Sequence, residues 1–302
     1  MPKTKIWLEA VRLRTLPLSV SGIIVGTALA NFYGIADTLV FVSALLAAIG
    51  FQITSNLAND YGDGVKGTDN ETRIGPRRTL QSGLLSKKEL KRGIVVSSVI
   101  NFFLILAVVY FAFGTERIGY LLLFVLLGLA SVWAAIKYTV GSSAYGYKGM
   151  GDLFVFIFFG LVAVLGSMFL NTKILYTQAL LPACTIGFLS TGVLNLNNLR
   201  DYESDTQAGK NTLVVRMGFK GGKIYHSLLL LGGFVTLLWF VLLNFENWYH
   251  FLSMVMFVPI FVHMRRVHGI KAPVLLDPEL KKLALSTFAM AVIFYISFNN
   301  FL

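Results

Sequence analysis

The chain has too few charged residues to build a water-exposed surface. Asp, Glu, Lys and Arg make up 14 % of its 302 residues, whereas soluble domains contain about 25 %. Hydrophobic residues make up 56 %, and a soluble protein of this length would still need a polar shell around its core. The composition therefore excludes an ordinary soluble domain and predicts a membrane protein.

Cysteine and histidine are also scarce. The single cysteine, Cys184, lies in an apolar run and has no disulfide partner within the chain, so we interpret it as a packing residue. The four histidines show no spacing typical of metal ligands: His226, His250, His263 and His268. The sequence therefore indicates neither a disulfide framework nor a Cys/His metal site.

Acidic residues are outnumbered by basic ones. The chain has 15 Asp and Glu against 26 Lys and Arg, which gives a net charge of +11. A basic excess is typical of proteins that bind nucleic acid or anionic lipid. Here the basic residues are confined to short loops between apolar runs. We interpret them as a membrane-topology signal and expect a lipid bilayer, and no nucleic acid, as a partner.

Nine apolar runs are long enough to cross a bilayer, which requires about 20 residues per helix. The first run contains Gly22 and Gly26, a GxxxG pattern that favours close helix packing within the protein. We expect the spans at 17–34, 38–58, 94–113, 118–136, 153–170, 177–197, 225–244, 248–264 and 283–301.

The loops between these spans alternate in charge. All Lys and Arg residues except Arg117 and Lys173 fall on one side, which the positive-inside rule makes cytoplasmic. An odd number of spans then places the N-terminus inside and the C-terminus outside. The two dominant cytoplasmic loops cover roughly 59–93 and 198–224. We therefore expect the functional residues at the cytoplasmic ends of the second and sixth spans.

Polar residues form a stripe at the end of the second span. The stripe follows the spacing of three and four residues that defines one face of a helix. An Asp at the centre of a spanning helix costs about 2.5–3.5 kcal/mol, so we expect these side chains to face the bundle interior near the membrane surface. The stripe consists of Gln52, Asn56, Asn59, Asp60 and Asp63. A second stripe ends the sixth span with Asn198, Asp201 and Asp205.

The two stripes share the pattern Asn-x3-Asp-Tyr, which begins at Asn56 and again at Asn197. This match favours two related halves within a single domain, residues 1–302. The first motif would occupy residues 56–69 and the second residues 197–210.

Carboxylates at two helix ends suit a hard cation. Mg²⁺ prefers oxygen ligands, takes one or two carboxylates, and completes its shell with water and phosphate oxygens. We therefore predict two Mg²⁺ ions bridged by a diphosphate, held by Asp60, Asp63, Asp69, Asp201 and Asp205. Because unpaired charge is costly away from water, such a site also needs basic partners. The candidates are Arg73, Arg77, Arg78, Lys137, Lys148, Arg200 and Lys210.

At these residues the sequence resembles the UbiA superfamily of intramembrane aromatic prenyltransferases. The N-D-x-x-D-x-x-x-D box of that family corresponds to Asn59–Asp69, where the last Asp comes two positions late, and its D-x-x-x-D box to Asp201–Asp205. The resemblance implies an all-α bundle of nine transmembrane helices and a Mg²⁺-dependent enzyme. It also implies a location in the bacterial plasma (inner) membrane, with the active site facing the cytoplasm.

Within the superfamily, the sequence most resembles the enzymes that prenylate 1,4-dihydroxy-2-naphthoate in menaquinone synthesis. The motifs of that branch account for the late Asp69, for the stretch Gly75–Gly83 and for Arg14–Pro17. One departure is Asp152, which follows Gly151 where that branch carries Glu. The role of Asp152 therefore stays open.

This resemblance implies transfer of a polyprenyl group from polyprenyl diphosphate to 1,4-dihydroxy-2-naphthoate, with loss of diphosphate and CO₂, giving demethylmenaquinone. Catalytic roles would fall to Asp60, Asp63, Asp201, Asp205, Arg77 and Lys210. Binding of the diphosphate or the acceptor would fall to Asn56, Asn59, Arg73, Arg78, Lys137, Lys148, Asn198, Arg200, Tyr61, Tyr138 and Tyr202. Aromatic faces would stabilise an allylic cation, with candidates at Tyr61, Tyr138, Tyr145 and Tyr202.

Three alternative hypotheses remain at this point. A UbiA-type enzyme could act on another aromatic or lipid acceptor. A CDP-alcohol phosphotransferase also uses membrane aspartates, but the Ala-Arg pair of its motif does not follow Asp63-Gly64. An ion-coupled transporter would carry its charged groups near the membrane midplane, whereas the charged groups of this chain gather at one face.

Overall fold

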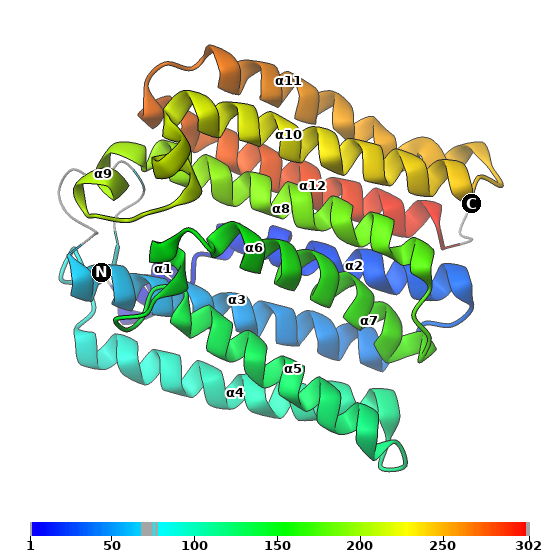
Figure 1. Ribbon diagram of the computed structural model, residues 1–302. Coiled ribbons are helices and arrows are strands. Elements are labelled where there is room, and N and C mark those ends of the chain that lie inside the picture. Colours follow the sequence, from blue (N-terminus) through cyan, green and yellow to red (C-terminus); the bar gives the residue numbers. More distant parts are fainter. Residues whose placement is uncertain (1, 68–74, 76–77, 300–302) are drawn as a thin grey trace.

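The computed structural model describes residues 2–67, 75 and 78–299 of the chain (Figure 1). Within these residues the secondary structure is entirely helical. The all-α membrane class expected from the sequence is therefore confirmed. Asp69, Arg73 and Arg77, which the sequence nominated for the site, lie outside the described residues.

The α-helices are separated by loops and by short 3₁₀ or π segments. The α-helices are α1 (Lys3–Val11), α2 (Leu16–Tyr33), α3 (Thr38–Lys66), α4 (Lys87–Phe113), α5 (Ile118–Lys137), α6 (Gly151–Val155), α7 (Ala163–Thr172), α8 (Leu180–Arg200), α9 (Tyr202–Gln207), α10 (Leu213–Leu243), α11 (Phe257–Gly269) and α12 (Asp277–Ser297). A π-helical segment, η3 (Phe156–Val162), joins α6 to α7 and makes one continuous span of them. The 3₁₀ segments are η1 (Leu13–Thr15), η2 (Tyr145–Lys148), η4 (Thr177–Ala179), η5 (Trp248–Met256) and η6 (Pro273–Leu276).

Among the described residues, eight helical stretches are long and apolar enough to cross a membrane. They correspond to eight of the nine expected spans. The ninth, 248–264, does not form one helix of sufficient length. Its first residues form the 3₁₀ segment η5, and α11 alone has only 13 residues. Pro259 lies in the first turn of α11, where a missing backbone N–H is tolerated. The count of nine spans and their orientation stay predictions.

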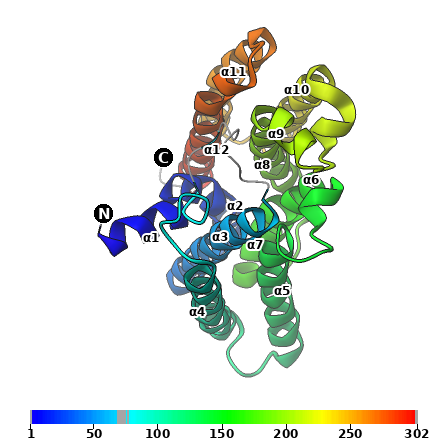
Figure 2. The same cartoon turned by 90° about the vertical axis from the view of Figure 1, so that its left-hand side faces the viewer.

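The spanning helices run side by side along one direction (Figure 1). Seen end-on, α3 and α4 lie on the opposite side of the molecule from α10 and α11, with α2, α8 and α12 between them (Figure 2). Helix α12 packs against both α2 and α8, and α8 packs against α10. The label N and helix α9 lie at one end of the bundle, and α12 ends at the other. Both aspartate motifs therefore belong to the end that holds α1 and α9.

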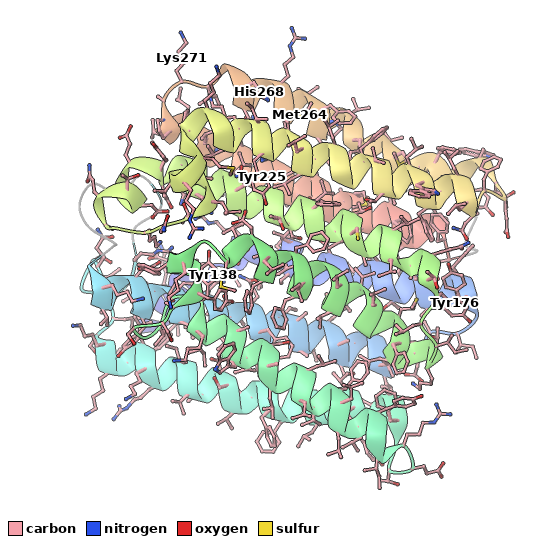
Figure 3. The ribbon with its side chains drawn as sticks, viewed as in Figure 1. Tyr138, Tyr176, Tyr225, Met264, His268 and Lys271 are labelled. Carbon is pink, nitrogen blue, oxygen red and sulfur yellow. The ribbon has the colours of Figure 1, made fainter. Side chains whose placement is uncertain are left out.

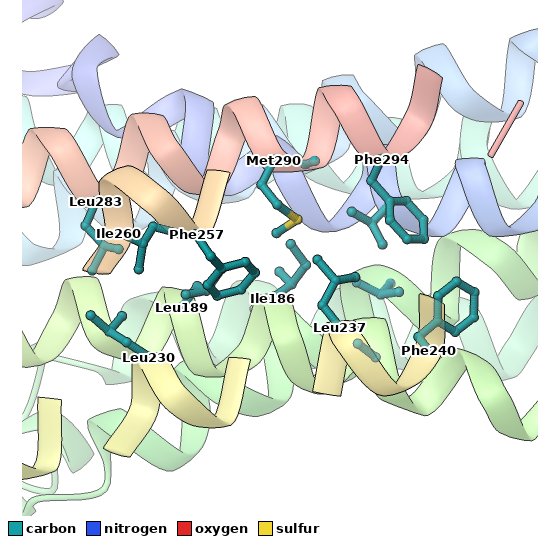
Figure 4. Close-up of a cluster of buried hydrophobic side chains, with 14 of the residues drawn as sticks. Ile186, Leu189, Leu230, Leu237, Phe240, Phe257, Ile260, Leu283, Met290 and Phe294 are labelled. Atoms are coloured by element: carbon teal, nitrogen blue, oxygen red, sulfur yellow. The ribbon is translucent and has the colours of Figure 1, made fainter. Parts of the chain in front are cut away.

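The largest apolar core joins α8, α10, α11 and α12 (Figure 4). Leu189 of α8 and Phe257 of α11 meet there with Leu237 of α10, and all three are at most 1 % exposed. Met290 and Phe294 of α12 close the cluster. This core fixes α8 and α12 relative to one another, and at the charged end of the bundle α8 ends while α12 begins.

The glycines of the GxxxG pattern lie where α2 meets α7 and the preceding π-helical segment. A Cβ atom at Gly26 would lie 2.2 Å from the carbonyl oxygen of Val164, and one at Gly22 would lie 2.6 Å from that of Phe159. No side chain fits at those distances. The close packing within the protein that was expected for this pattern is confirmed.

We predict that Gly26→Val destabilises the protein by about 1–3 kcal/mol, because the added methyl groups would push α2 away from α7. Thermal unfolding in detergent measures the effect. Gly119→Val is the matched control, since a Cβ at Gly119 would meet nothing within 4 Å. Equal melting temperatures for the two variants would contradict the tight helix contact.

Candidate active site

A cavity of about 550 Å³ runs between the helices from the charged end of the bundle. Its mouth is lined by charged and polar side chains that come from α3, α8, α9 and α12 and from the loops near them. Its deeper part is apolar and includes Ile23 of α2, Val108 of α4, Phe124 of α5 and Leu170 of α7. The cavity therefore joins a charged compartment to an apolar one.

Ten of the residues nominated from the sequence line this cavity. They are Asn59, Asp63, Arg78, Tyr138, Tyr145, Asn198, Arg200, Asp201, Asp205 and Lys210. Six nominated residues that the structure describes lie outside the lining: Asn56, Asp60, Tyr61, Lys137, Lys148 and Tyr202.

Lys210 connects the two aspartate motifs. Its ammonium nitrogen lies 3.8 Å from Oδ1 of Asp63, near the end of α3, and 3.3 Å from Oδ1 of Asp205 in α9. The Tyr147 hydroxyl donates a hydrogen bond of 2.7 Å to the same oxygen of Asp63. The two carboxylates are 5 % and 4 % exposed. The motifs, which are far apart in the sequence, thus face one another across a single cation.

Burial controls the protonation of this cluster. Burial raises the pKa of Asp205 to about 6, against the opposing pull of the Lys210 ammonium. Burial also lowers the pKa of Lys210, but the carboxylates of Asp63, Asp205 and Asp201 outweigh it and the net direction is upward. Lys210 therefore stays charged, and Asp205, with a pKa of about 6, is half protonated near pH 6. A second cation near Asp205 would favour its charged form further.

Asp60 points away from the cavity toward the loop that follows the first motif. Its Oδ2 accepts hydrogen bonds from the backbone N–H of Thr79, at 3.0 Å, and from the Thr79 hydroxyl, at 2.5 Å. Oδ1 accepts a longer bond of 3.4 Å from the N–H of Leu80. In this structure Asp60 fastens the loop, and its role as a metal ligand stays a prediction.

The second motif is held by Arg200, the last residue of α8. Its guanidinium donates 2.7 Å hydrogen bonds to both carboxylate oxygens of Asp201. It also donates to Oδ1 of Asn197, at 2.8 Å, and to Oδ1 of Asp277, at 2.7 Å. Arg200 is 2 % exposed. Its buried positive charge is therefore stabilised by these partners rather than by water.

Two of the four candidate tyrosines face the cavity. Tyr138 and Tyr145 both line it, and their rings meet edge-on at 5.4 Å. Tyr138 lies near the charged end, far from Tyr176 at the opposite end (Figure 3). Tyr61 packs instead in a cluster with α1 and α4, and Tyr202 contacts Phe219.

Asp152, whose role was open, is buried beside the cavity without lining it. The Tyr225 side chain of α10 lies near its carboxylate, the carboxylate Oδ1 is buried without a hydrogen-bond partner among the described residues, and the Thr191 hydroxyl donates to the Asp152 backbone carbonyl at 3.4 Å. Tyr225 is labelled in Figure 3. In this structure Asp152 joins the start of α6 to α8 through its backbone carbonyl.

Sequence reasoning gave no site role to several residues that line the cavity. Arg12 and Arg14 come from the turn between α1 and α2, and Tyr147 from η2. Asp277 and Lys281 come from the first turns of α12. Their positions depend on how helices distant in the sequence pack. Only the arginines carried a signal, since Arg14 opens the motif Arg14–Pro17.

The residues at the mouth of the cavity suit a hard divalent cation that takes part of its coordination from a bound ligand. Within the described part of the chain, no three Asp, Glu, His or Cys side chains converge closely enough to form a complete protein cage. Asp63, Asp201 and Asp205 nevertheless all line the same cavity, and the Lys210 ammonium already occupies a cation position between Asp63 and Asp205. This arrangement matches Mg²⁺, which keeps few protein ligands and takes phosphate and water oxygens.

Residues 19–276 match the sequence model of the UbiA prenyltransferase family. The chain belongs to this family. It is 44 % identical to the 1,4-dihydroxy-2-naphthoate octaprenyltransferase of Escherichia coli K12, over 93 % of this chain and 90 % of that one. It is 40 % identical to the enzyme of the same name from Haemophilus influenzae, over 97 % and 95 %.

Solved structures of UbiA proteins share the fold. The apo structure of a UbiA homolog from Aeropyrum pernix K1 superposes with a TM-score of 0.72 at 15 % identity, over 95 % of this chain and 98 % of that one. A UbiA homolog from Archaeoglobus fulgidus, bound to DMAPP and Mg²⁺, gives a TM-score of 0.64 at 15 % identity, over 93 % and 98 %. At these identities the likeness concerns the fold alone. The family match displaces the phosphotransferase and transporter hypotheses.

We predict that Lys210→Gln lowers the melting temperature without metal and increases the rise in melting temperature that Mg²⁺ produces. The substitution leaves Asp63 and Asp205 without their shared cation and removes the competitor of a metal ion. Thermal unfolding with and without Mg²⁺ measures both effects. Lys220→Gln, at an exposed position of α10, makes the same change in charge as a control. The same response to Mg²⁺ in both variants would contradict the bridging role of Lys210.

For Asp60, we predict that Thr79→Val lowers the free energy of unfolding by about 1.5–3 kcal/mol, because it removes a hydrogen bond to a charged group. Thr206→Val is the control, since the Thr206 hydroxyl donates only to the Tyr202 carbonyl at an exposed site. Thermal unfolding of both variants gives the difference. Unchanged stability of Thr79→Val relative to this control would show that Asp60 does not anchor the loop.

Proposed function

We propose that this protein transfers a polyprenyl group from polyprenyl diphosphate to 1,4-dihydroxy-2-naphthoate, with loss of diphosphate and CO₂. The product is demethylmenaquinone, formed as its quinol, an intermediate of menaquinone biosynthesis. The observation that carries the proposal is the cavity, in which two facing aspartate motifs open into an apolar channel. The acceptor is supported by the names of the relatives from Escherichia coli and Haemophilus influenzae.

The charged mouth would bind the donor diphosphate. Asp63, Asp201 and Asp205 would hold Mg²⁺, which supplies Lewis-acid stabilisation of the leaving diphosphate. We propose two ions, with Asp60 and Asp69 as the remaining ligands that the motif implies. Use of Mg²⁺ is supported by the UbiA homologs from Archaeoglobus fulgidus that were solved with prenyl diphosphates and Mg²⁺.

Basic side chains at the mouth would bind the leaving group. Lys210 and Arg78 line the cavity beside the aspartates, and Arg77 is the third cation expected there. Charge-assisted hydrogen bonds from these groups to the diphosphate oxygens would strengthen as negative charge develops on the leaving group. They therefore favour breaking the allylic C–O bond.

The apolar part of the cavity would hold the prenyl chain and protect the allylic cation from water. Tyr138 and Tyr145 line the cavity next to the charged mouth, where their ring faces can stabilise a cation. Phe154 stacks on Tyr145 at 3.9 Å between ring centroids and extends the aromatic wall. Side chains such as Phe124 and Leu170 continue it into the bundle.

The acceptor would enter the same compartment with its carboxylate toward basic groups of the wall. Arg12 and Arg14 line the cavity and are suited to a carboxylate. A new C–C bond forms between the allylic carbon and the ring carbon that carries the carboxylate. The bond to CO₂ then breaks, and its electron pair returns to the ring as the aromatic quinol is restored.

We place the reaction at the cytoplasmic face of the bacterial plasma membrane. The proposal is supported by the basic loops, which gather on the side of the chain that carries both motifs. Both substrates carry anionic groups, which suits an aqueous mouth, and the polyprenyl chain suits the apolar interior.

We predict that the purified protein in lipid nanodiscs releases labelled CO₂ from carboxyl-labelled 1,4-dihydroxy-2-naphthoate only when polyprenyl diphosphate and Mg²⁺ are both present. Mass spectrometry of the extracted lipid identifies the product, and EDTA should abolish it. Asp201→Ala is expected to lower kcat by at least about 100-fold, because it removes charge stabilisation from the transition state.

Two outcomes would contradict the proposal. One is a prenylated product that retains the carboxylate, which would exclude replacement at that ring carbon. The other is efficient prenylation of 4-hydroxybenzoate with none of the naphthoate, which would assign a different acceptor. Near wild-type turnover by Asp201→Ala would contradict the role of the second motif.

A further inference from the structure

The ion cluster of Arg200 extends beyond the second motif to a carboxylate from the far end of the sequence. Asp277 is the first residue of α12, 77 positions after Arg200. Its Oδ1 accepts a 2.7 Å hydrogen bond from Nη1 of Arg200. Asp277 lines the same cavity as Asp201 and Asp205. The apolar core that fixes α12 against α8 keeps this contact in place.

Arg200 divides its donors between two carboxylates and the side-chain amide oxygen of Asn197. Nε and Nη2 bind the two oxygens of Asp201, and Nη1 binds Asp277. Both Asp201 oxygens are therefore engaged by a buried guanidinium. A metal ion that binds Asp201 has to share these oxygens with Arg200 or replace it.

The two carboxylates differ in exposure. The Asp201 side chain is 9 % exposed, whereas that of Asp277 is 38 % exposed. Moving Asp201 toward a metal ion weakens the pairing of a guanidinium that is 2 % exposed. A buried charge that loses its only partner is strongly destabilised. The bond from Nη1 to Asp277 does not involve Asp201, so it would compensate the guanidinium if Asp201 turned toward a metal ion.

We propose that Asp277 is a positioning residue that holds Arg200 so that Asp201 is available to Mg²⁺ and the donor diphosphate. Asp277 touches neither substrate in this role. It acts through Arg200, and it sets how strongly Arg200 competes for Asp201. The inference rests on the proposed function, since it takes Asp201 to be a ligand of the Mg²⁺ that binds with a prenyl diphosphate.

The test measures binding rather than turnover. The probe is geranyl thiodiphosphate, a poorly reactive analogue, and its Mg²⁺-dependent binding to the full-length protein in detergent is followed by calorimetry over a series of Mg²⁺ concentrations. We expect Asp277→Asn to raise the Mg²⁺ concentration needed for half-maximal binding about tenfold, because Arg200 then holds Asp201 alone. Asp277→Glu, which keeps the carboxylate, should restore most of the binding.

A double-mutant cycle separates action through Arg200 from the general effect of a negative charge. In an Arg200→Gln background, Asp277→Asn should change the Mg²⁺ requirement by less than about twofold, because the competing guanidinium is gone. Arg200→Lys, which loses the planar fork, serves as the second background if Arg200→Gln does not fold. Lys281→Met, which removes a cation from the same helix and the same cavity wall, reports the pure charge effect and should lower the requirement.

The outcomes are distinct. A wild-type requirement in Asp277→Asn would overturn the inference, and so would an equal weakening with and without Arg200, which would mean that Asp277 acts by its charge alone. If the wild-type protein bound the analogue equally well without Mg²⁺, the proposed Mg²⁺-dependent binding of the donor would be wrong. The inference about Asp277 would then be wrong too. The inference is supported if Asp277→Asn raises the Mg²⁺ requirement of the wild-type protein but not that of the Arg200 variants.

Discussion

The ion pairs of Lys210 with Asp63 and Asp205 join the two halves of the site. Carboxylates at the ends of apolar helices cannot be left without a cation, because the surrounding interior solvates charge poorly. Lys210 meets this requirement from the loop after α9, and it draws the end of α3 toward α9. Arg200 meets it for Asp201 and Asp277. The mouth of the cavity is therefore shaped by the need to neutralise buried acids, and the same need makes it receptive to a divalent cation.

The apolar helices form the walls and the inner part of the cavity behind its charged mouth. The core of α8, α10, α11 and α12 and the tight contact between α2 and α7 hold the wall helices rigidly. Between them remains a channel that is charged at one end and apolar beyond it. A substrate with a diphosphate head and a hydrocarbon tail matches both parts. This division of polarity explains why a membrane fold, rather than a soluble one, suits the proposed reaction.

The helical class and the location of the site could be predicted from the sequence. Long apolar runs specify spanning helices, and the spacing of Asn59 and Asp63 placed them on one helix face that does line the cavity. The facing of the two motifs followed from charge placement in the loops. The same periodicity also nominated Asp60, whose carboxylate turns to Thr79 instead. Helical spacing determines the direction of a side chain only to within tens of degrees. A nearby backbone donor then determines where the carboxylate finally points.

Other features depend on tertiary packing that no local pattern reveals. In the sequence, Asp277 looks like an ordinary acidic residue at the start of a helix. Only the packing of α12 on α8 brings it to Arg200. The segment 248–264 carries enough apolar residues for a span, yet its first part forms a 3₁₀ helix. The metal role of the two aspartate motifs is tested by an experimental structure with Mn²⁺, which scatters anomalously, and a prenyl thiodiphosphate. We predict anomalous peaks between the diphosphate and the carboxylates of Asp63 and of Asp201 or Asp205, with Lys210 moved onto a phosphate oxygen. Peaks remote from both motifs, with Lys210 still between Asp63 and Asp205, would contradict this role.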